Sequence, residues 1–536
     1  MKNILKYRKY DDLLPGPPAH PIFGNTKTFS NKTTEEIFQA LRDLFSEAVE
    51  KGQSLIRHRI LGTFYVWPLD GKTVSCLTDF FSFPEVVVFW ELAVLSITFL
   101  RCGFLQKPII IDFLIFCSLN RYYNNSDDFF KVFFFQKILE STTELDKGGP
   151  YEFFNDWLGG GTLLEGYGER WRSHRKMLTP TFHFAKLEGY FEVFNTESRV
   201  VVDCLDKFAK SGETVDLFPF FKRCTLDTIC KTAMGAKVDA QLQNSHPYIT
   251  AIEQALQLGV LYAMNPHHQI PAIYWALGHQ KKKDEYFNIM KTFTRNVIAE
   301  RRTARESGEV EKETSKRNMN FLDILLSNEE SSVLSPEDLR QEVDTFMFAG
   351  HDTTTTSVSW VCWNLAHHPD IQQNVYEEIV SVFGEDPNED VTTEGIKKLE
   401  YTERMLKESK RICPTVPAVL RQLISDMEIG GVLIPAGANV AIAPMAIHKN
   451  ANIYQNPDIF DPDRFLPEET AKRHAYDFIP FSAGLRNCIG QKFAQLNEKV
   501  MVIHLLKNFK IEPMGGYYST KQVFEPVGKP SNGIPV

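Results

Sequence analysis

The chain has 536 residues, a formal net charge of −9 and 43% hydrophobic residues, so it is long enough for two or three domains of average size. The acidic balance argues against a nucleic-acid partner, because binding a phosphate backbone requires a basic surface. The nine cysteines are scattered and include no CxxC pair, which favours a reducing compartment without disulfides or a structural zinc site.

Residues 1–20 are predicted to be a tail and a stiff hinge. MKNILKYRKYDD lacks the apolar run of a signal peptide and the roughly 20 apolar residues of a membrane helix. The prolines of LPGPPAHPIFGN follow directly and favour an extended conformation. No Gly/Ser-rich or proline-rich linker follows, so residues 21–536 are expected to form a single domain.

The first predicted elements are a helix and a pair of strands. Residues 33–51 have apolar side chains at helical spacing, with Thr34 as the N-cap. Residues 54–79 alternate polar positions with Val, Tyr and Phe, which is typical of strands.

An atypical phenylalanine-rich segment follows at residues 80–135. It contains 13 of the 41 phenylalanines, so it reads as an insertion. Its longest apolar run, LAVLSITFL, is too short to span a bilayer. A translated intron or another gene-model error is the leading interpretation, and a real insertion or a membrane-dipping segment is the alternative.

The next informative stretch is EGYGERWRSHRKML. Trp171 and Arg175 lie four residues apart, so on a helix they share a face. The triple glycine at residues 159–161 is predicted to be a turn. Residues 188–299 have an amphipathic helical pattern, and the charged residues 300–318 are expected to form an exposed loop.

A long helix is predicted from Ser335, the N-cap, and Pro336, the first helical residue. Its centre, FMFAGHDTTTT, contains Gly350 and four threonines, which are poor helix formers. Because threonine hydroxyls can bond backbone carbonyls and loosen the helix, a local bulge is expected here.

A further helix is predicted over residues 399–414, with Glu408 and Arg411 one turn apart. Such a pair is common and weakly stabilising when exposed. Lys410 lies between them.

The segment FSAGLRNCIG, residues 481–490, precedes a predicted helix starting at Gln491. Gly484 can adopt positive φ, so that the loop could direct backbone N–H groups toward the Cys488 sulfur and lower its pKa. Gly490 would allow close approach of a flat ligand, Phe481 could shield the sulfur, and Arg486 could neutralise an anionic group.

These motifs together resemble the signature of the cytochrome P-450 family, the haem-thiolate monooxygenases. The resemblance implies a mainly α fold with small β-sheets, with haem between the oxygen-activating helix and the helix after the cysteine loop. It implies that Cys488 ligates the haem iron as thiolate and that Asp352 and Thr353 deliver protons. It further implies that propionates are bound by four residues, Trp171, Arg175, Arg421 and Arg486, and that Arg464 completes a buried network with Glu408 and Arg411.

FMFAGHDTT is most similar to the fourth P-450 family, which includes fatty-acid ω-hydroxylases and many insect members. Those proteins commonly carry a glutamate, which can form an ester with haem, where this chain has Ala349. We therefore expect non-covalent haem b. Two further departures are Lys410 for an apolar residue and Leu485 for proline.

The resemblance implies insertion of one oxygen atom from O2 into a fatty acid, related lipid or xenobiotic. Electrons would come from NADPH through a reductase, with cytochrome b5 as a second donor. Phe346 and Phe348 suggest an apolar substrate site. The implied location is the cytoplasmic face of the endoplasmic reticulum membrane, although residues 1–20 show no anchor helix. Two alternatives stay open: an inactive or misassembled chain, and a non-catalytic haem-binding protein.

Overall fold

The computed structural model describes residues 55–60, 63–68, 136–159, 161–164, 168–182, 187–308, 320–330, 334–429, 432–523 and 525–536. The predicted tail and hinge at 1–20, the predicted helix at 33–51 and the whole phenylalanine-rich segment at 80–135 lie outside these ranges. Within them, no helix is both long and apolar enough to cross a membrane.

Helices make up most of the described chain, as predicted. Those that build the body are α7 (Asn155–Leu158), α8 (Glu169–Leu178), α10 (Phe191–Ser211), α11 (Phe218–Ile229), α12 (Pro247–Met264), α13 (Pro271–Ala276), α14 (His279–Glu306), α16 (Phe321–Glu330), α17 (Pro336–His367), α18 (Pro369–Phe383), α19 (Thr393–Ile396), α20 (Glu400–Ile412), α21 (Pro444–Ile447), α22 (Pro467–Thr470) and α23 (Gln491–Asn508).

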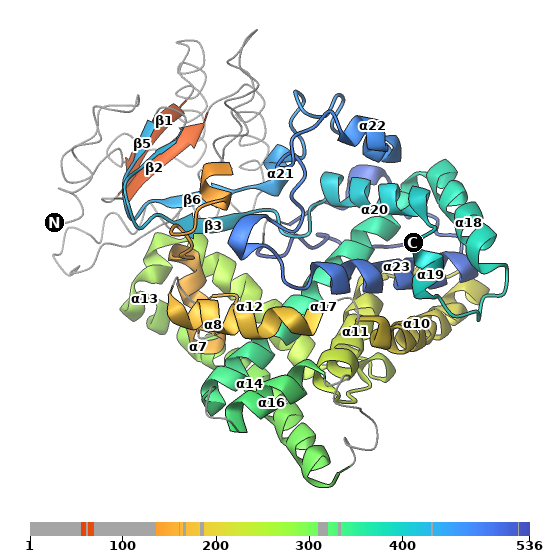
Figure 1. The fold of residues 1–536 in the computed structure, drawn as a ribbon, viewed down its shortest axis with the longest axis horizontal. Helices are drawn as coiled ribbons and strands as arrows, with labels where there is room; N and C mark the ends of the chain where they lie inside the picture. The colour runs from red at the N-terminus through yellow and green to blue at the C-terminus, as the bar shows by residue number, and fades with distance from the viewer. Residues whose placement is uncertain are drawn as a thin grey trace.

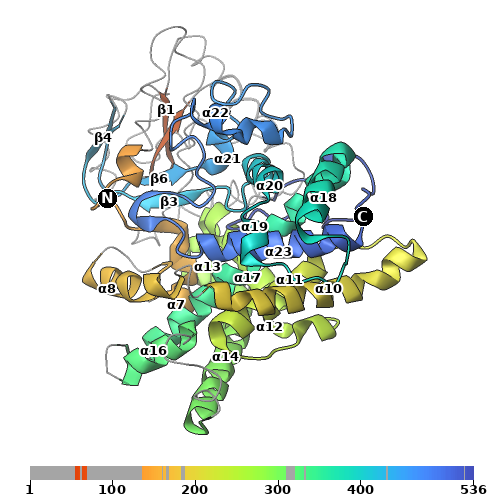
Figure 2. The same ribbon diagram turned by 45° about the vertical axis from the view of Figure 1, so that its right-hand side comes forward.

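Three two-stranded antiparallel sheets gather at one side of this helical body (Figures 1 and 2). β1 (Leu55–Ile60) pairs with β2 (Thr63–Pro68), which confirms the predicted strands there. β3 (Val419–Gln422) pairs with β6 (Asn439–Ile442), and β4 (Met427–Ile429) with β5 (Val432–Ile434).

The helix α17 lies at the centre of the body and packs against α11, α14, α20 and α23. It begins as predicted: the Ser335 hydroxyl accepts the Asp338 N–H, and the Asp338 carboxylate accepts the Ser335 N–H. This capping box satisfies two N–H groups that a helix start otherwise leaves free. The helix is continuous from Pro336 to His367, so the predicted bulge at its centre is not seen.

One other prediction is corrected by the helices. The charged stretch expected to be a loop from residue 300 is helical as far as Glu306, because α14 continues through it. Phe346 and Phe348, which are predicted to lie near an apolar substrate site, are buried among aromatic side chains: Phe346 lies 4.3 Å from Phe321, and Phe348 lies 5.3 Å from Trp157, between ring centroids.

Candidate active site

The cysteine loop is closed at its two ends by one backbone hydrogen bond, from the Cys488 N–H to the Phe481 carbonyl at 2.9 Å. Gly484 has φ +69°, and a Cβ built there would lie 1.7 Å from the Leu139 carbonyl oxygen. Only glycine meets both conditions without strain. The loop then turns into α23, whose N-cap is Gly490.

Cys488 as a whole residue is exposed, although protein atoms crowd around its thiol. Burial by these atoms raises the pKa of the thiol, while the Gly490 N–H and the charge of Arg175 act in the opposite direction. The Gly490 N–H therefore acts on the sulfur in the predicted direction, while desolvation acts against it and is the larger influence. A bound metal ion is the charge that favours a thiolate at such a site.

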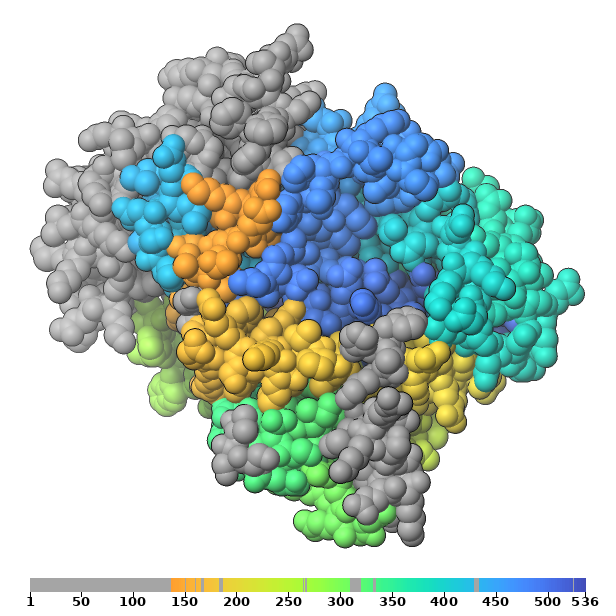
Figure 3. Space-filling view, in the orientation of Figure 1, coloured from red at the N-terminus to blue at the C-terminus, as the bar shows by residue number. Residues whose placement is uncertain are grey.

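The helix α8 lies beside this loop, as Figure 3 shows for the yellow-orange and blue segments near residues 170 and 485. Arg175 donates to the Asn487 carbonyl at 3.0 Å and to its side-chain oxygen at 2.7 Å. The Arg486 guanidinium stacks 4.3 Å from the Trp171 ring centroid. The structure therefore brings three of the four predicted propionate-binding residues together.

The fourth, Arg421, is buried in β3 and lies near Arg486. Both of their charges act on Lys147, whose pKa is held well below its ordinary value by burial and then by these two guanidinium groups. The two guanidinium groups and the Lys147 amine are thus near enough to influence one another, and an anionic ligand among them would favour their charged forms. The sequence did not predict a role for Lys147. It is brought near Arg421 by the β-bridge between their chain neighbours, Asp146 and Gln422, which lie far apart in the sequence.

Trp171 supplies a second indication of a ligand. Its ring is buried, and its indole N–H has no hydrogen-bond acceptor among the described residues. A buried donor without a partner is costly in a folded protein. The indole and the cations together suit the carboxylates of a haem, so the residues present fit this group.

Asp352 is buried in α17 and forms an ion pair with Lys222 of α11, at 3.2 Å between Nζ and Oδ1. Lys222 also binds Glu253 of α12 at 2.7 Å, and the Glu253 side chain is 34% exposed. Burial would raise the pKa of Asp352, but Lys222 and His351 hold it below its ordinary value. Asp352 is therefore ionised at neutral pH.

Thr353, the predicted partner of Asp352, donates its hydroxyl to the Ala349 carbonyl at 2.6 Å. The hydroxyl oxygen is left to accept a hydrogen bond. Gly350, read from the sequence as a source of looseness, has a packing role: a Cβ there would lie 2.7 Å from the Ile229 side chain. Because Gly350 has no Cβ, α11 and α17 can approach each other closely.

The predicted network around Glu408 is present. Arg411 binds both carboxylate oxygens, at 2.7 and 2.8 Å, and both side chains are fully buried. Arg464 approaches the same carboxylate at 3.5 Å. Arg411 also donates to the carbonyls of His448, Pro457 and Ile459, so this network joins α20 to the segment that leads to the cysteine loop.

Two neighbouring groups were not predicted. His448 accepts the Ile479 N–H through Nε2 at 3.0 Å. Its pKa is lowered to about 3, mainly by burial and secondly by the charge of Arg411. Lys410, which departs from the apolar residue of the family pattern, forms a buried ion pair with Glu498 of α23. Glu498 also accepts the Ser357 hydroxyl at 2.5 Å, so this lysine has a partner that makes its burial tolerable.

A mainly helical body with a cysteine beside the start of α23, and with cations and an indole gathered near it, defines a protein of the haem-thiolate class.

The comparisons with known proteins agree. The family model for cytochrome P450 matches residues 123–532. The chain is 38% identical over 406 residues to cytochrome P450 4V2 of Pongo abelii, covering 74% of this chain and 77% of the relative. It is 37% identical over 415 residues to cytochrome P450 4c3 of Drosophila melanogaster, covering 75% and 77%. The chain belongs to the cytochrome P450 family, and its resemblance to the fourth family is confirmed.

Membership makes the chain a haem-dependent monooxygenase that uses O2, a hydrophobic substrate and a redox partner. Its cofactor is non-covalent haem b, with NADPH as the electron source.

Proposed function

We propose that this chain inserts one oxygen atom from O2 into a fatty acid, a related lipid or a xenobiotic, with electrons from an NADPH-dependent reductase and cytochrome b5 as a second donor. The observation that carries the proposal is the Cys488 loop, whose closure at Phe481 and close contact at Gly484 keep the sulfur in one place. Thiolate-ligated haem supplies the activation of O2 and favours O–O cleavage.

In this proposal the propionates are bound by Trp171, Arg175, Arg421 and Arg486. Support comes from the indole N–H that has no acceptor among the described residues and from the neighbouring cations. The Glu408–Arg411–Arg464 network acts on folding, since breaking a buried ion pair costs about 3 to 5 kcal/mol.

Proton delivery is assigned to Asp352 and Thr353. The Asp352 carboxylate is kept ionised by Lys222 and can accept a proton, and the Thr353 hydroxyl oxygen can accept a hydrogen bond from water. Lys222 connects Asp352 to Glu253. Because Glu253 is partly exposed, this row of three charged groups extends from the solvent to α17.

We further propose association with the endoplasmic reticulum membrane, on its cytoplasmic face. Trp275 of α13 is 74% exposed and Leu277 beside it is 51% exposed. Exposed tryptophan suits a membrane–water interface. This pair would lie against the lipid surface.

The first test is the absorption spectrum of the reduced, carbon-monoxide-bound protein. Wild type is expected to show the strongly red-shifted Soret band of thiolate-ligated haem, and Cys488→Ser is expected to lose it. Cys204→Ser, which changes a cysteine of α10 far from the loop in sequence, is the matched control and should keep it. A band that survives in Cys488→Ser would contradict the proposal.

A further inference from the structure

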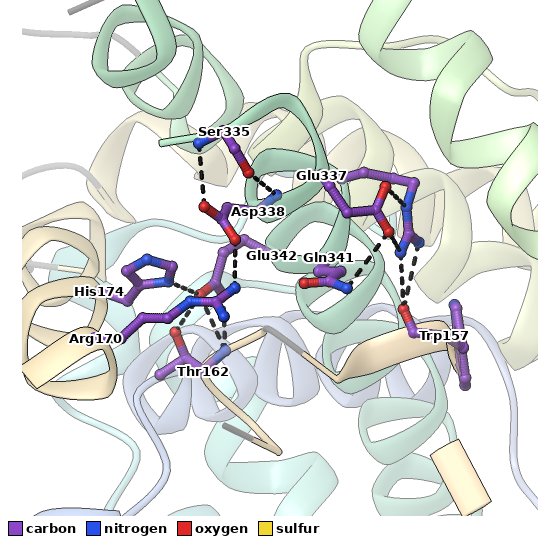
Figure 4. A network of polar contacts seen from close by, with 10 residues as sticks. Trp157, Thr162, Arg170, His174, Ser335, Glu337, Asp338, Gln341 and Glu342 are labelled. Atoms are coloured by element: carbon purple, nitrogen blue, oxygen red, sulfur yellow. Dashed lines mark hydrogen bonds and ion pairs between the residues drawn. The ribbon is translucent and has the colours of Figure 1, made fainter. Parts of the chain in front are cut away.

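A buried carboxylate near the start of α17, Glu342, receives three hydrogen bonds (Figure 4). The Thr162 N–H lies 3.0 and 3.1 Å from its two oxygens, and the Thr162 hydroxyl donates at 2.6 Å. His174 Nδ1 of α8 lies 2.8 Å from the same carboxylate. Glu342 is fully buried, so each of these contacts is made away from water and is correspondingly strong.

The loop at residues 161–164 is thereby fixed against α17. Gly161 shows how close the contact is, because a Cβ there would lie 2.1 Å from the Thr345 hydroxyl and 2.8 Å from the Gln341 carbonyl. Any other residue at this position would push the loop away from the helix. The loop has no helix or strand of its own, so Glu342 and this close packing determine where Thr162 lies.

The same contacts lead to the propionate side of the site. The Thr162 carbonyl accepts a hydrogen bond from Arg486 at 3.3 Å, and Arg486 stacks on Trp171. Trp171 lies one turn before His174 on α8, and His174 contacts Glu342. The contacts therefore form a closed ring through Glu342, Thr162, Arg486, Trp171 and His174.

We propose that Glu342 is a positioning residue for haem: by fixing Thr162 and His174 it keeps Arg486 and Trp171 where they bind the propionates. This inference rests on the proposed function. A carboxylate suits the position because it only accepts hydrogen bonds and has enough lone pairs for all three donors. A glutamine would turn an NH2 group toward one of these donors and break the ring there.

The test is a double-mutant cycle read by the rate of haem loss from the loaded protein to excess apomyoglobin, followed by absorbance. Arg486→Leu removes a charge-assisted contact worth about 1.5 to 3 kcal/mol, so haem loss should accelerate by about tenfold to a hundredfold. Glu342→Gln alone should accelerate it several-fold. The double variant should lose haem no faster than Arg486→Leu, because Glu342 acts only through the ring.

Asp344→Asn is the matched control. Asp344 is equally buried on the same helix, but it pairs with Arg340 and accepts the Thr294 hydroxyl, outside the ring. Its effect on haem loss, whatever its size, should multiply with that of Arg486→Leu. If Glu342→Gln behaves in this multiplicative way too, its role is only structural and the inference is overturned.

A second variant covers the case in which Glu342→Gln does not fold. Thr162→Val removes only the hydroxyl donor and keeps the backbone N–H. It should accelerate haem loss in the wild-type background and leave Arg486→Leu unchanged, and a multiplied effect would overturn the inference. A wild-type chain that takes up no haem would remove the proposed function itself, which separates the two failures.

Discussion

Replacing Lys222 with methionine leaves the Asp352 carboxylate buried without its cation. The Lys222 side chain is 3% exposed and that of Asp352 is 5% exposed, so water cannot take over the role of the ammonium group. Removing one partner of a buried pair costs about 3 to 5 kcal/mol. Methionine keeps the length and the apolar stem of lysine, so the loss is electrostatic for the most part.

The pH dependence identifies this cause. In wild type the pKa of Asp352 is lowered in the folded state, so the ion pair stabilises the protein above about pH 4 and is lost as the pH falls through the folded pKa. Without Lys222 burial dominates and raises that pKa above its unfolded value. The carboxylate then destabilises the fold increasingly as the pH rises from about 4. Lys222→Met should therefore cost less at pH 4 than at pH 7, because the penalty of the unpaired carboxylate is added only as the pH rises.

Urea unfolding at a series of pH values, followed by circular dichroism, measures this difference. Asp352→Asn is the companion variant, because it removes the charge that Lys222 compensates. In that background, Lys222→Met should cost much less than it does in wild type. An equal loss at pH 4 and pH 7 would refute the reasoning and would assign the cost to packing.

Three further predictions concern the scaffold beneath the site. Arg411→Met should lower the free energy of unfolding by about 3 to 5 kcal/mol, because it leaves the buried Glu408 carboxylate without its cation. Urea titration measures this loss. A loss below about 1 kcal/mol would be typical of a surface pair and would contradict the prediction. Acidification from pH 7 to pH 5 should destabilise wild type by about 2 kcal/mol through His448, which is neutral when folded but takes up a proton below about pH 6.5 when unfolded; His448→Gln should show a shallower decline in the same titration, and parallel curves would contradict this. Gly484→Ala should lower the melting temperature far more than Gly212→Ala, because both glycines have φ near +70° but only the first meets a backbone carbonyl; equal shifts would mean that backbone strain alone is responsible.

The sequence predicted those features that short-range spacing determines. The N-cap at Ser335, the Glu408–Arg411 pair and the turn at Gly484 each depend on residues within a few positions of one another. Their geometry follows once the local helix or loop forms. The resemblance of these short motifs to a known family then supplied the fold.

The contacts that the sequence could not predict join residues more than a hundred positions apart. Lys222 meets Asp352 across 130 residues, and His174 meets Glu342 across 168. Such pairs depend on how α8, α11 and α17 pack, and no local pattern encodes that. A signal existed for Lys222, since a lysine between phenylalanines and a cysteine on an apolar helix face needs a buried partner.

The helix α17 carries three buried carboxylates that face different neighbours. Glu342 contacts the loop before α8, Asp344 accepts a hydroxyl from α14, and Asp352 pairs with α11. Glu342 and Asp344 are two positions apart, so they point about 200° apart around the helix, and Asp352 lies about 15 Å along the axis from Glu342. At such separations, without shared partners, substitutions act independently. Changes at Glu342 should therefore appear in haem retention, changes at Asp344 in folding and changes at Asp352 in proton delivery, so that one helix serves three separable tasks.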